Sequence, residues 1–198
     1  MLNPTLTALI PLLPLAGFVI LGFFGRKYFK NSSGIIATIV LLTATALAIY
    51  TAYGYFFEYG KVNGVYEKLI PLRYTWLKFS EGVSIDMGIM LDPITCMMLV
   101  VITFISLMVH IYSLAYMKGE ERFATYYSFL GLFTFSMLAL VISSNVFQIY
   151  IFWELVGVSS FLLIGFYYDK PRAVAACKKA FIVTRFADLG FLIGILML

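Results

Sequence analysis

The residues of this sequence that could do chemistry are ionisable side chains inside long apolar runs. Glu154 lies eight residues into an apolar segment that begins near Val146. Arg185 and Asp188 lie in the next apolar segment, spaced i, i+3, so they share one face of a helix and can form an ion pair. Charged side chains are costly in a bilayer unless they are paired or hydrated, and they commonly mark ion or proton pathways. These three residues are therefore candidates for a site that moves protons.

Both carboxylates are expected near the middle of a bilayer. At about 1.5 Å per helical residue, Glu154 lies about 12 Å from the start of its segment, and Asp188 lies about 12 Å from a boundary near Ala180. Two antiparallel helices with a short connection would bring both carboxylates and Arg185 to a similar depth. A carboxyl group that lies in apolar surroundings beside a cation is suited to taking up and releasing a proton. The alternative is that these groups only hydrogen-bond neighbouring helices.

Three further ionisable residues could contribute to such a site. His110 is the one histidine of the chain and lies about 9 Å from the end of its apolar segment. Imidazole titrates near neutral pH and suits a proton relay, although a histidine that only hydrogen-bonds between helices is the alternative. Lys178 and Lys179 lie near the start of the last apolar segment, where lysines can also extend to the membrane boundary.

The cysteines do not indicate a metal site. The chain contains two, Cys96 and Cys177, inside or beside apolar runs, with no CxxC pair and no histidine at ligand spacing. Neither a metal site nor a disulfide framework is predicted from that arrangement.

The composition indicates a membrane protein. The chain has 198 residues, of which 62% are apolar and 12% charged, whereas soluble domains have about 50% apolar and about 25% charged residues. A cytosolic enzyme, a nucleic-acid binder and a disordered chain are therefore poor candidates. The net charge of +4 comes from basic residues spread over loops and ends, which is typical of topology signals and not of a nucleic-acid-binding surface.

Six apolar segments are long enough to span a bilayer, which takes roughly 20 residues. They run approximately over residues 5–24, 35–57, 94–116, 126–143, 146–168 and 173–198. The predicted fold class is an all-α membrane protein with about six transmembrane helices and an external loop or hairpin between the second and third. Residues 1–91 are expected to form two helices plus that loop, and residues 92–198 the start of a helix bundle.

The basic residues in short loops predict the orientation of the chain. The loops after the first, third and fifth segments carry Arg26, Lys27, Lys30, Lys118, Arg122, Lys170 and Arg172, whereas the loop at Ser144 and Asn145 carries none. Short positive loops face the cytoplasm, so the N-terminus and residues 58–92 are expected outside. Alternation over Val83–Met90 predicts a strand or hairpin there, and Asp92-Pro93 predicts the start of the third helix, with proline in its first turn.

The motifs around these residues resemble those of a known family. They comprise Leu91-Asp92-Pro93-Ile94, His110-Ile111-Tyr112-Ser113, Tyr116-Met117-Lys118, the run from Phe152 to Tyr168 and the run from Lys179 to Asp188. Together they resemble the antiporter-like membrane subunits of respiratory complex I, in the branch of subunit L and chain 5. The resemblance extends over the whole chain, more loosely in the first 85 residues. A large subunit of the multisubunit sodium/proton antiporters has similar motifs and is the alternative.

The resemblance implies proton translocation in a bacterial inner membrane, coupled to electron transfer from NADH to quinone in other complex I subunits. Glu154 matches the central glutamate of the family's fifth helix, Arg185 and Asp188 match its sixth-helix ion pair, and Lys179 matches a lysine of the same motif. No cofactor is expected in this chain, because it has no CxxC cluster ligands and no GxGxxG turn. NADH, FMN, iron-sulfur clusters and quinone are expected in partner subunits.

The sequence departs from the family pattern at its end. It stops at Leu198 within an apolar run, so the family's seventh-helix lysine, which partners the glutamate, is absent. An N-terminal fragment of a longer protein is therefore expected. Besides secondary sodium/proton exchange, a non-catalytic membrane scaffold is the remaining alternative, in which the charged residues only hold helices together.

Overall fold

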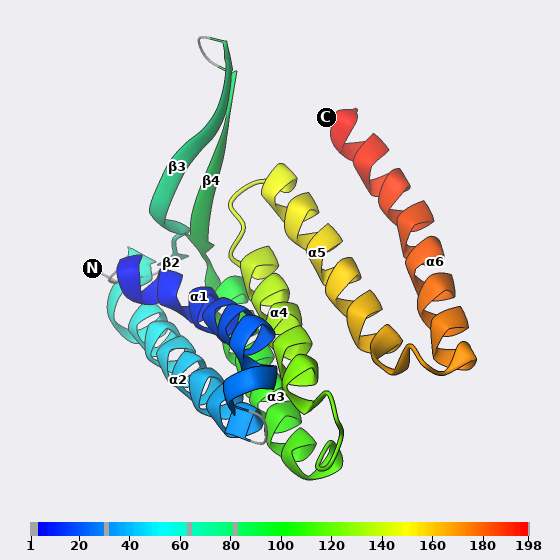
Figure 1. Cartoon of the computed structure of the whole chain (residues 1–198). Helices are drawn as coiled ribbons and strands as arrows, with labels where there is room; N and C mark the ends of the chain where they lie inside the picture. The colour runs from blue at the N-terminus through cyan, green and yellow to red at the C-terminus, as the bar shows by residue number, and fades with distance from the viewer. Residues whose placement is uncertain (1–3, 30–31, 63–64, 81–82, 198) are drawn as a thin grey trace.

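The computed structural model describes residues 4–29, 32–62, 65–80 and 83–197, which form six α-helices and a β-hairpin between the second and third helices (Figure 1). The helices are α1 (Pro4–Ile20), α2 (Ser33–Tyr53), α3 (Pro93–Tyr116), α4 (Phe123–Val141), α5 (Val146–Ile164) and α6 (Pro171–Leu196). Wider π-helical turns extend α1 and α2, namely η1 (Leu21–Phe29) and η3 (Gly54–Tyr59), and a 3-10 turn, η4 (Gly165–Tyr167), follows α5. The predicted helical class and the predicted position of the hairpin are confirmed.

Five helices of the described chain are long and apolar enough to cross a membrane. These segments are Thr5–Phe29, Ser33–Glu58, Pro93–Tyr116, Phe123–Val141 and Val146–Tyr167. The sixth predicted segment is helical, but it is not one of these five. Its residues form α6, a helix of 26 residues, but α6 is not among the helices of the described chain that are apolar enough to cross a membrane. The reason is its five charged side chains, Arg172, Lys178, Lys179, Arg185 and Asp188.

The six helices form a bundle of four with a pair at its side (Figure 1). Helices α1 to α4 pack on one another around buried side chains such as Leu99, Leu138 and Tyr127. Helix α5 packs on α4, and α6 packs mainly on α5 and η4. The position of α6 therefore depends on its contacts with α5.

Local capping explains where two helices begin. Asp92 precedes α3, and its carboxylate accepts a hydrogen bond of 2.6 Å from the Thr95 amide, with Pro93 in the first turn as predicted. Asn145 precedes α5 in the same way, and its side-chain oxygen accepts a hydrogen bond of 2.8 Å from the Gln148 amide. Asn145 therefore fixes the residue at which the Glu154 helix begins.

The segment between α2 and α3 forms two antiparallel strand pairs. The short pair is β1 (Lys61–Val62) with β2 (Val65–Tyr66), and the long pair is β3 (Leu69–Ser80) with β4 (Val83–Leu91). Strand β4 matches the alternation noted in the sequence, whereas β3 was not predicted. The long hairpin projects from the end of the bundle where α5 begins, opposite the α3–α4 and α5–α6 connections (Figure 1).

The long hairpin is hydrogen-bonded to the turn between α4 and α5. The Met90 amide donates to the Ile142 carbonyl over 2.8 Å. The Gln148 side chain pairs with both backbone groups of Gly88: its Oε1 accepts from the Gly88 amide, and its Nε2 donates to the Gly88 carbonyl, each over 3.0 Å. These bonds fix the start of α5 relative to β4.

Candidate functional site

Helix α6 presents a carboxylate to α5. Its buried residues are Cys177, Asp188 and Ile195, which are separated by close to whole numbers of helical turns and so form one stripe. Because α6 packs mainly on α5, Asp188 points toward α5 and away from the exposed face of α6. The side chain of Asp188 is 7% exposed.

Arg185 connects the two helices through Glu154. Its Nη1 forms an ion pair with Oε2 of Glu154, and its Nη2 donates a long hydrogen bond of 3.4 Å to the Glu154 carbonyl. Both side chains are about three-quarters buried. The guanidinium therefore lies against α5 at Glu154, the carboxylate that the sequence analysis expected near the middle of a bilayer.

Asp188 is the second carboxylate beside the same guanidinium. Its Oδ2 lies 3.7 Å from Nη1 of Arg185, which is the i, i+3 pairing predicted from the sequence. Its Oδ1 accepts a hydrogen bond of 2.8 Å from the indole Nε1 of Trp153 on α5. The two helices are thus joined at one depth by Trp153, Glu154, Arg185 and Asp188, here called the charge cluster.

Gly157 gives the guanidinium room to reach Glu154. A Cβ atom at this position would lie 2.7 Å from Nη2 of Arg185. The closest separation in ordinary van der Waals contact is 3.4 Å, so any larger residue would displace the guanidinium. Gly157 is thus a place of close contact between α5 and α6, and its partner is Arg185.

The guanidinium is also held from the side of α6. Its Cζ lies 4.8 Å from the centre of the Phe181 ring, within the range of a cation–π interaction. Its Nε is buried and has no hydrogen-bond acceptor in the part of the chain that the structure describes. Arg185 thus makes its polar contacts through its Nη atoms.

One bound proton is enough to bring the net charge of the charge cluster to zero. Two carboxylates and one guanidinium carry a net charge of −1 when all are ionised. Charge is unfavourable in apolar surroundings, so one proton bound to either carboxylate would make the cluster neutral. The arrangement can therefore alternate between a charged and a neutral state by the exchange of a single proton.

The remaining predicted site residues lie apart from this cluster. Lys178 and Lys179 are exposed on α6. His110 is 2% exposed in α3, where its Nδ1 lies 2.8 Å from the Ser106 carbonyl oxygen and its ring packs on Tyr127. None of the described contacts of His110 reaches α5 or α6.

His110 borders a small internal cavity of about 10 Å³ between α1, α2, α3 and α4. Tyr127 and Thr134 also line it. A cavity of about 10–15 Å³ is the smallest that can hold one water molecule. The predicted role of His110 as a proton relay stays a prediction.

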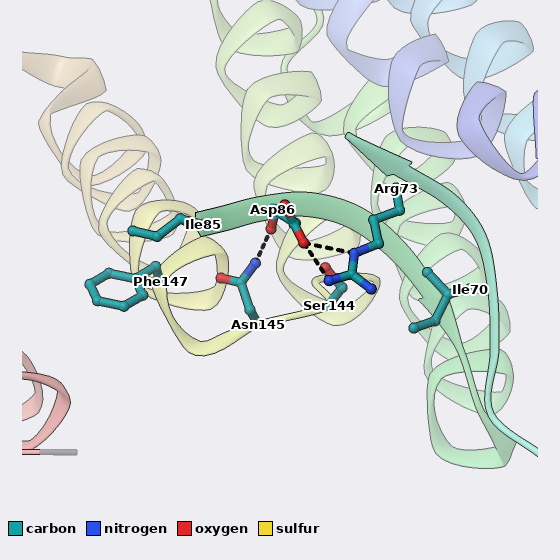
Figure 2. A pocket seen from close by; sticks show the side chains of 7 residues that line it. All are labelled: Ile70, Arg73, Ile85, Asp86, Ser144, Asn145 and Phe147. Carbon is teal, nitrogen blue, oxygen red and sulfur yellow. Dashed lines mark hydrogen bonds and ion pairs between the residues drawn. The ribbon is translucent and has the colours of Figure 1, made fainter. Parts of the chain in front are cut away.

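A second polar site lies outside the bundle, between the hairpin and the α4–α5 turn. Figure 2 shows Asp86 of β4 between Arg73 of β3 and Asn145, beside a pocket of about 370 Å³. Arg73 Nε donates to the Asp86 carboxylate over 2.7 Å, and Asn145 donates to the Asp86 carbonyl. Since Asn145 also caps α5, this pocket is part of the structure that positions the Glu154 helix.

No group of three His, Cys, Asp or Glu side chains in the described ranges could hold a metal ion. Trp153 was not among the predicted site residues. The signal for it was available, because an indole N–H in an apolar segment requires an acceptor.

Two families match separate parts of the chain. Residues 76–127 match the family described as NADH-Ubiquinone oxidoreductase (complex I), chain 5 N-terminus. Residues 143–198 match the family described as NADH:quinone oxidoreductase/Mrp antiporter, TM, and this region contains the whole charge cluster. The chain belongs to the subunit L and chain 5 family of antiporter-like membrane subunits.

Several members of this family are similar along nearly all of the chain. It is 41% identical over 192 residues to NADH-quinone oxidoreductase subunit L of Neisseria meningitidis, covering 96% of this chain and 27% of that protein. It is also 41% identical over 192 residues to the chloroplastic NAD(P)H-quinone oxidoreductase subunit 5 of Anthoceros angustus, covering 95% of this chain and 25% of that protein. The chain thus spans about a quarter of the length of these relatives.

Solved structures show the same fold in more distant proteins. One is an archaeal respiratory membrane complex, the membrane-bound sulfane sulfur reductase, with a TM-score of 0.76 at 17% identity, over 95% of this chain and 36% of that one. The other is the Mrp complex from Dietzia sp. DQ12-45-1b, with a TM-score of 0.72 at 21% identity, over 94% of this chain and 18% of that one.

Proposed function

We propose that this chain is part of a proton-translocating membrane subunit of NADH:quinone oxidoreductase, in which protons move in response to electron transfer in other subunits. The observation that carries the proposal is the position of the Arg185 guanidinium, against Glu154 and 3.7 Å from Asp188. The relatives named as quinone oxidoreductase subunits indicate the class of redox partner.

In this proposal Glu154 takes up and releases the proton. While Glu154 is ionised, it pairs with Arg185. When Glu154 is protonated, the guanidinium moves the short distance to Asp188, so the cation is paired in both states. Proton exchange at Glu154 therefore never leaves an unpaired cation in the apolar layer.

The other predicted residues have supporting roles in the proposal. His110 relays protons within the α1–α4 bundle, next to its small cavity. Lys179 supplies a positive charge on the exposed face of α6, near the cytoplasmic boundary. Partner subunits hold the NADH site, FMN, the iron-sulfur clusters and quinone.

We also propose that the membrane is a bacterial inner membrane, with the N-terminus and hairpin outside. Lys118, Arg122 and Lys170 belong to the α3–α4 and α5–α6 connections, and Arg172 lies in the first turn of α6. Both connections lie at the end of the bundle opposite the hairpin (Figure 1). An excess of lysine and arginine in short loops supports a cytoplasmic location for that end. Lys30, which was predicted to contribute, lies outside the described residues.

The test is Glu154→Gln in the assembled complex reconstituted into vesicles. NADH oxidation by quinone and proton uptake are measured together, and Glu121→Gln, which changes an exposed carboxylate of the α3–α4 turn, is the matched control. We expect Glu154→Gln to remove most of the proton uptake per NADH oxidised, at a normal amount of assembled complex. Normal proton uptake, or sodium-driven proton flux without a redox reaction, would contradict the proposal.

A further inference from the structure

Trp153 makes a contact that proton exchange at Glu154 does not by itself explain. Its indole Nε1 donates to Oδ1 of Asp188 over 2.8 Å, across the α5–α6 interface. Its ring is half-exposed and packs edge-on against Phe191 of α6, with ring centres 6.0 Å apart. The donor group is thus directed at the buried carboxylate, although much of the ring lies at the surface.

The two oxygens of Asp188 have different partners. Oδ1 accepts from Trp153, and Oδ2 faces Nη1 of Arg185 at 3.7 Å. The distance to Arg185 is too long for a hydrogen bond, so the indole N–H is the one short hydrogen bond described for this carboxylate. A hydrogen bond to an ionised group is stronger than one to a neutral group, and therefore the Trp153 contact favours the carboxylate form of Asp188.

Few charged groups surround Asp188. Arg185 on its own helix and Glu154 on α5 are the ionisable neighbours within the charge cluster. The other element packed on α6 is η4, whose Tyr167 hydroxyl donates to Glu120. The choice of which carboxylate binds the proton thus lies between Glu154 and Asp188.

We propose that Trp153 is a positioning residue that keeps Asp188 ionised, with Oδ2 directed at Arg185, so that the proton binds Glu154 and the guanidinium has an acceptor to move to. This inference rests on the proposed function. Without the indole N–H, the proton would neutralise the cluster at Asp188 instead, and Glu154 would remain paired with Arg185. Proton exchange at Glu154 would then stop.

The test is a double-mutant cycle in the assembled complex, with Trp153→Phe, Asp188→Asn and both together. Loss of a hydrogen bond to a charged group is worth about 1.5–3 kcal/mol, which corresponds to about a 10- to 150-fold change in the proton's preference between the two carboxylates. We expect Trp153→Phe to lower proton uptake per NADH about tenfold. The double variant should be no worse than Asp188→Asn alone, because Trp153 acts through Asp188.

Two controls separate positioning from packing. Phe191→Leu removes the ring contact and keeps the indole N–H, so we expect near-normal proton uptake. Replacing Trp153 with 3-benzothienylalanine keeps the bicyclic shape and removes the N–H, so we expect the same loss as with Trp153→Phe.

The inference would be overturned if the losses of proton uptake in Trp153→Phe and Asp188→Asn added up in the double variant. Normal proton uptake with benzothienylalanine at position 153 would overturn it as well. If Glu154→Gln abolishes uptake while the Trp153 variants pump normally, only this inference fails. If Glu154→Gln pumps normally, the proposed function fails first.

Discussion

Replacing Gly157 with alanine is expected to displace the Arg185 guanidinium from Glu154. The new Cβ would lie 2.7 Å from Nη2, where ordinary contact begins at 3.4 Å, so the guanidinium must move by roughly 0.7 Å. It lies at the end of a flexible side chain and can move without a change in the backbone. A displacement of about 1 Å at a reacting centre can lower a rate about 100-fold, so we expect a tenfold to 100-fold loss of proton uptake.

The assay is NADH-driven proton uptake in vesicles that contain the assembled complex. Alanine is about 1 kcal/mol more favourable than glycine within a helix, so a loss of transport could not be attributed to a weaker α5. Gly190→Ala and Gly194→Ala on α6 are matched controls, because a Cβ at either position meets no atom within 4 Å. Equal proton uptake by Gly157→Ala and the two controls would refute the reasoning that the guanidinium must lie against Glu154.

Two further predictions concern Gln148, which joins the hairpin to the start of α5, and His110, which lies apart from the charge cluster. Gln148→Ala removes both hydrogen bonds to Gly88 and is expected to destabilise the docked hairpin by about 2–3 kcal/mol. Hydrogen exchange of the β4 amides measures this loss. Unchanged protection of those amides would show that Gln148 does not hold the hairpin. His110→Gln keeps a hydrogen-bonding side chain that does not titrate, and is expected to slow proton uptake several-fold with assembly unchanged; an unaltered rate would remove His110 from the proton path.

The helices and three members of the charge cluster, Glu154, Arg185 and Asp188, could be predicted because their signals are local. Apolar runs set the helix lengths, and the i, i+3 spacing of Arg185 and Asp188 predicted their pairing. The depth of Glu154 followed from counting residues along α5. These properties do not depend on how α5 and α6 are rotated relative to each other.

The roles of Trp153 and Gly157 could not be derived from spacing, because they depend on that rotation. Only the packing of α6 on α5 places Asp188 against the indole and Arg185 above Gly157. Strand β3 was missed for a different reason. Leu69–Ser80 includes Pro71 and lacks regular alternation of polar and apolar residues, and it pairs with β4 across several register shifts.

The central claim is that Glu154 gains and loses a proton while Arg185 alternates between two carboxylates. The most direct measurement is infrared difference spectroscopy of the assembled complex during NADH oxidation, which detects the carbonyl stretch of protonated carboxyl groups. We predict a carboxyl band that appears during turnover and is absent in Glu154→Gln. A turnover spectrum that is identical in Glu154→Gln would show that Glu154 keeps one protonation state throughout, and would contradict the claim.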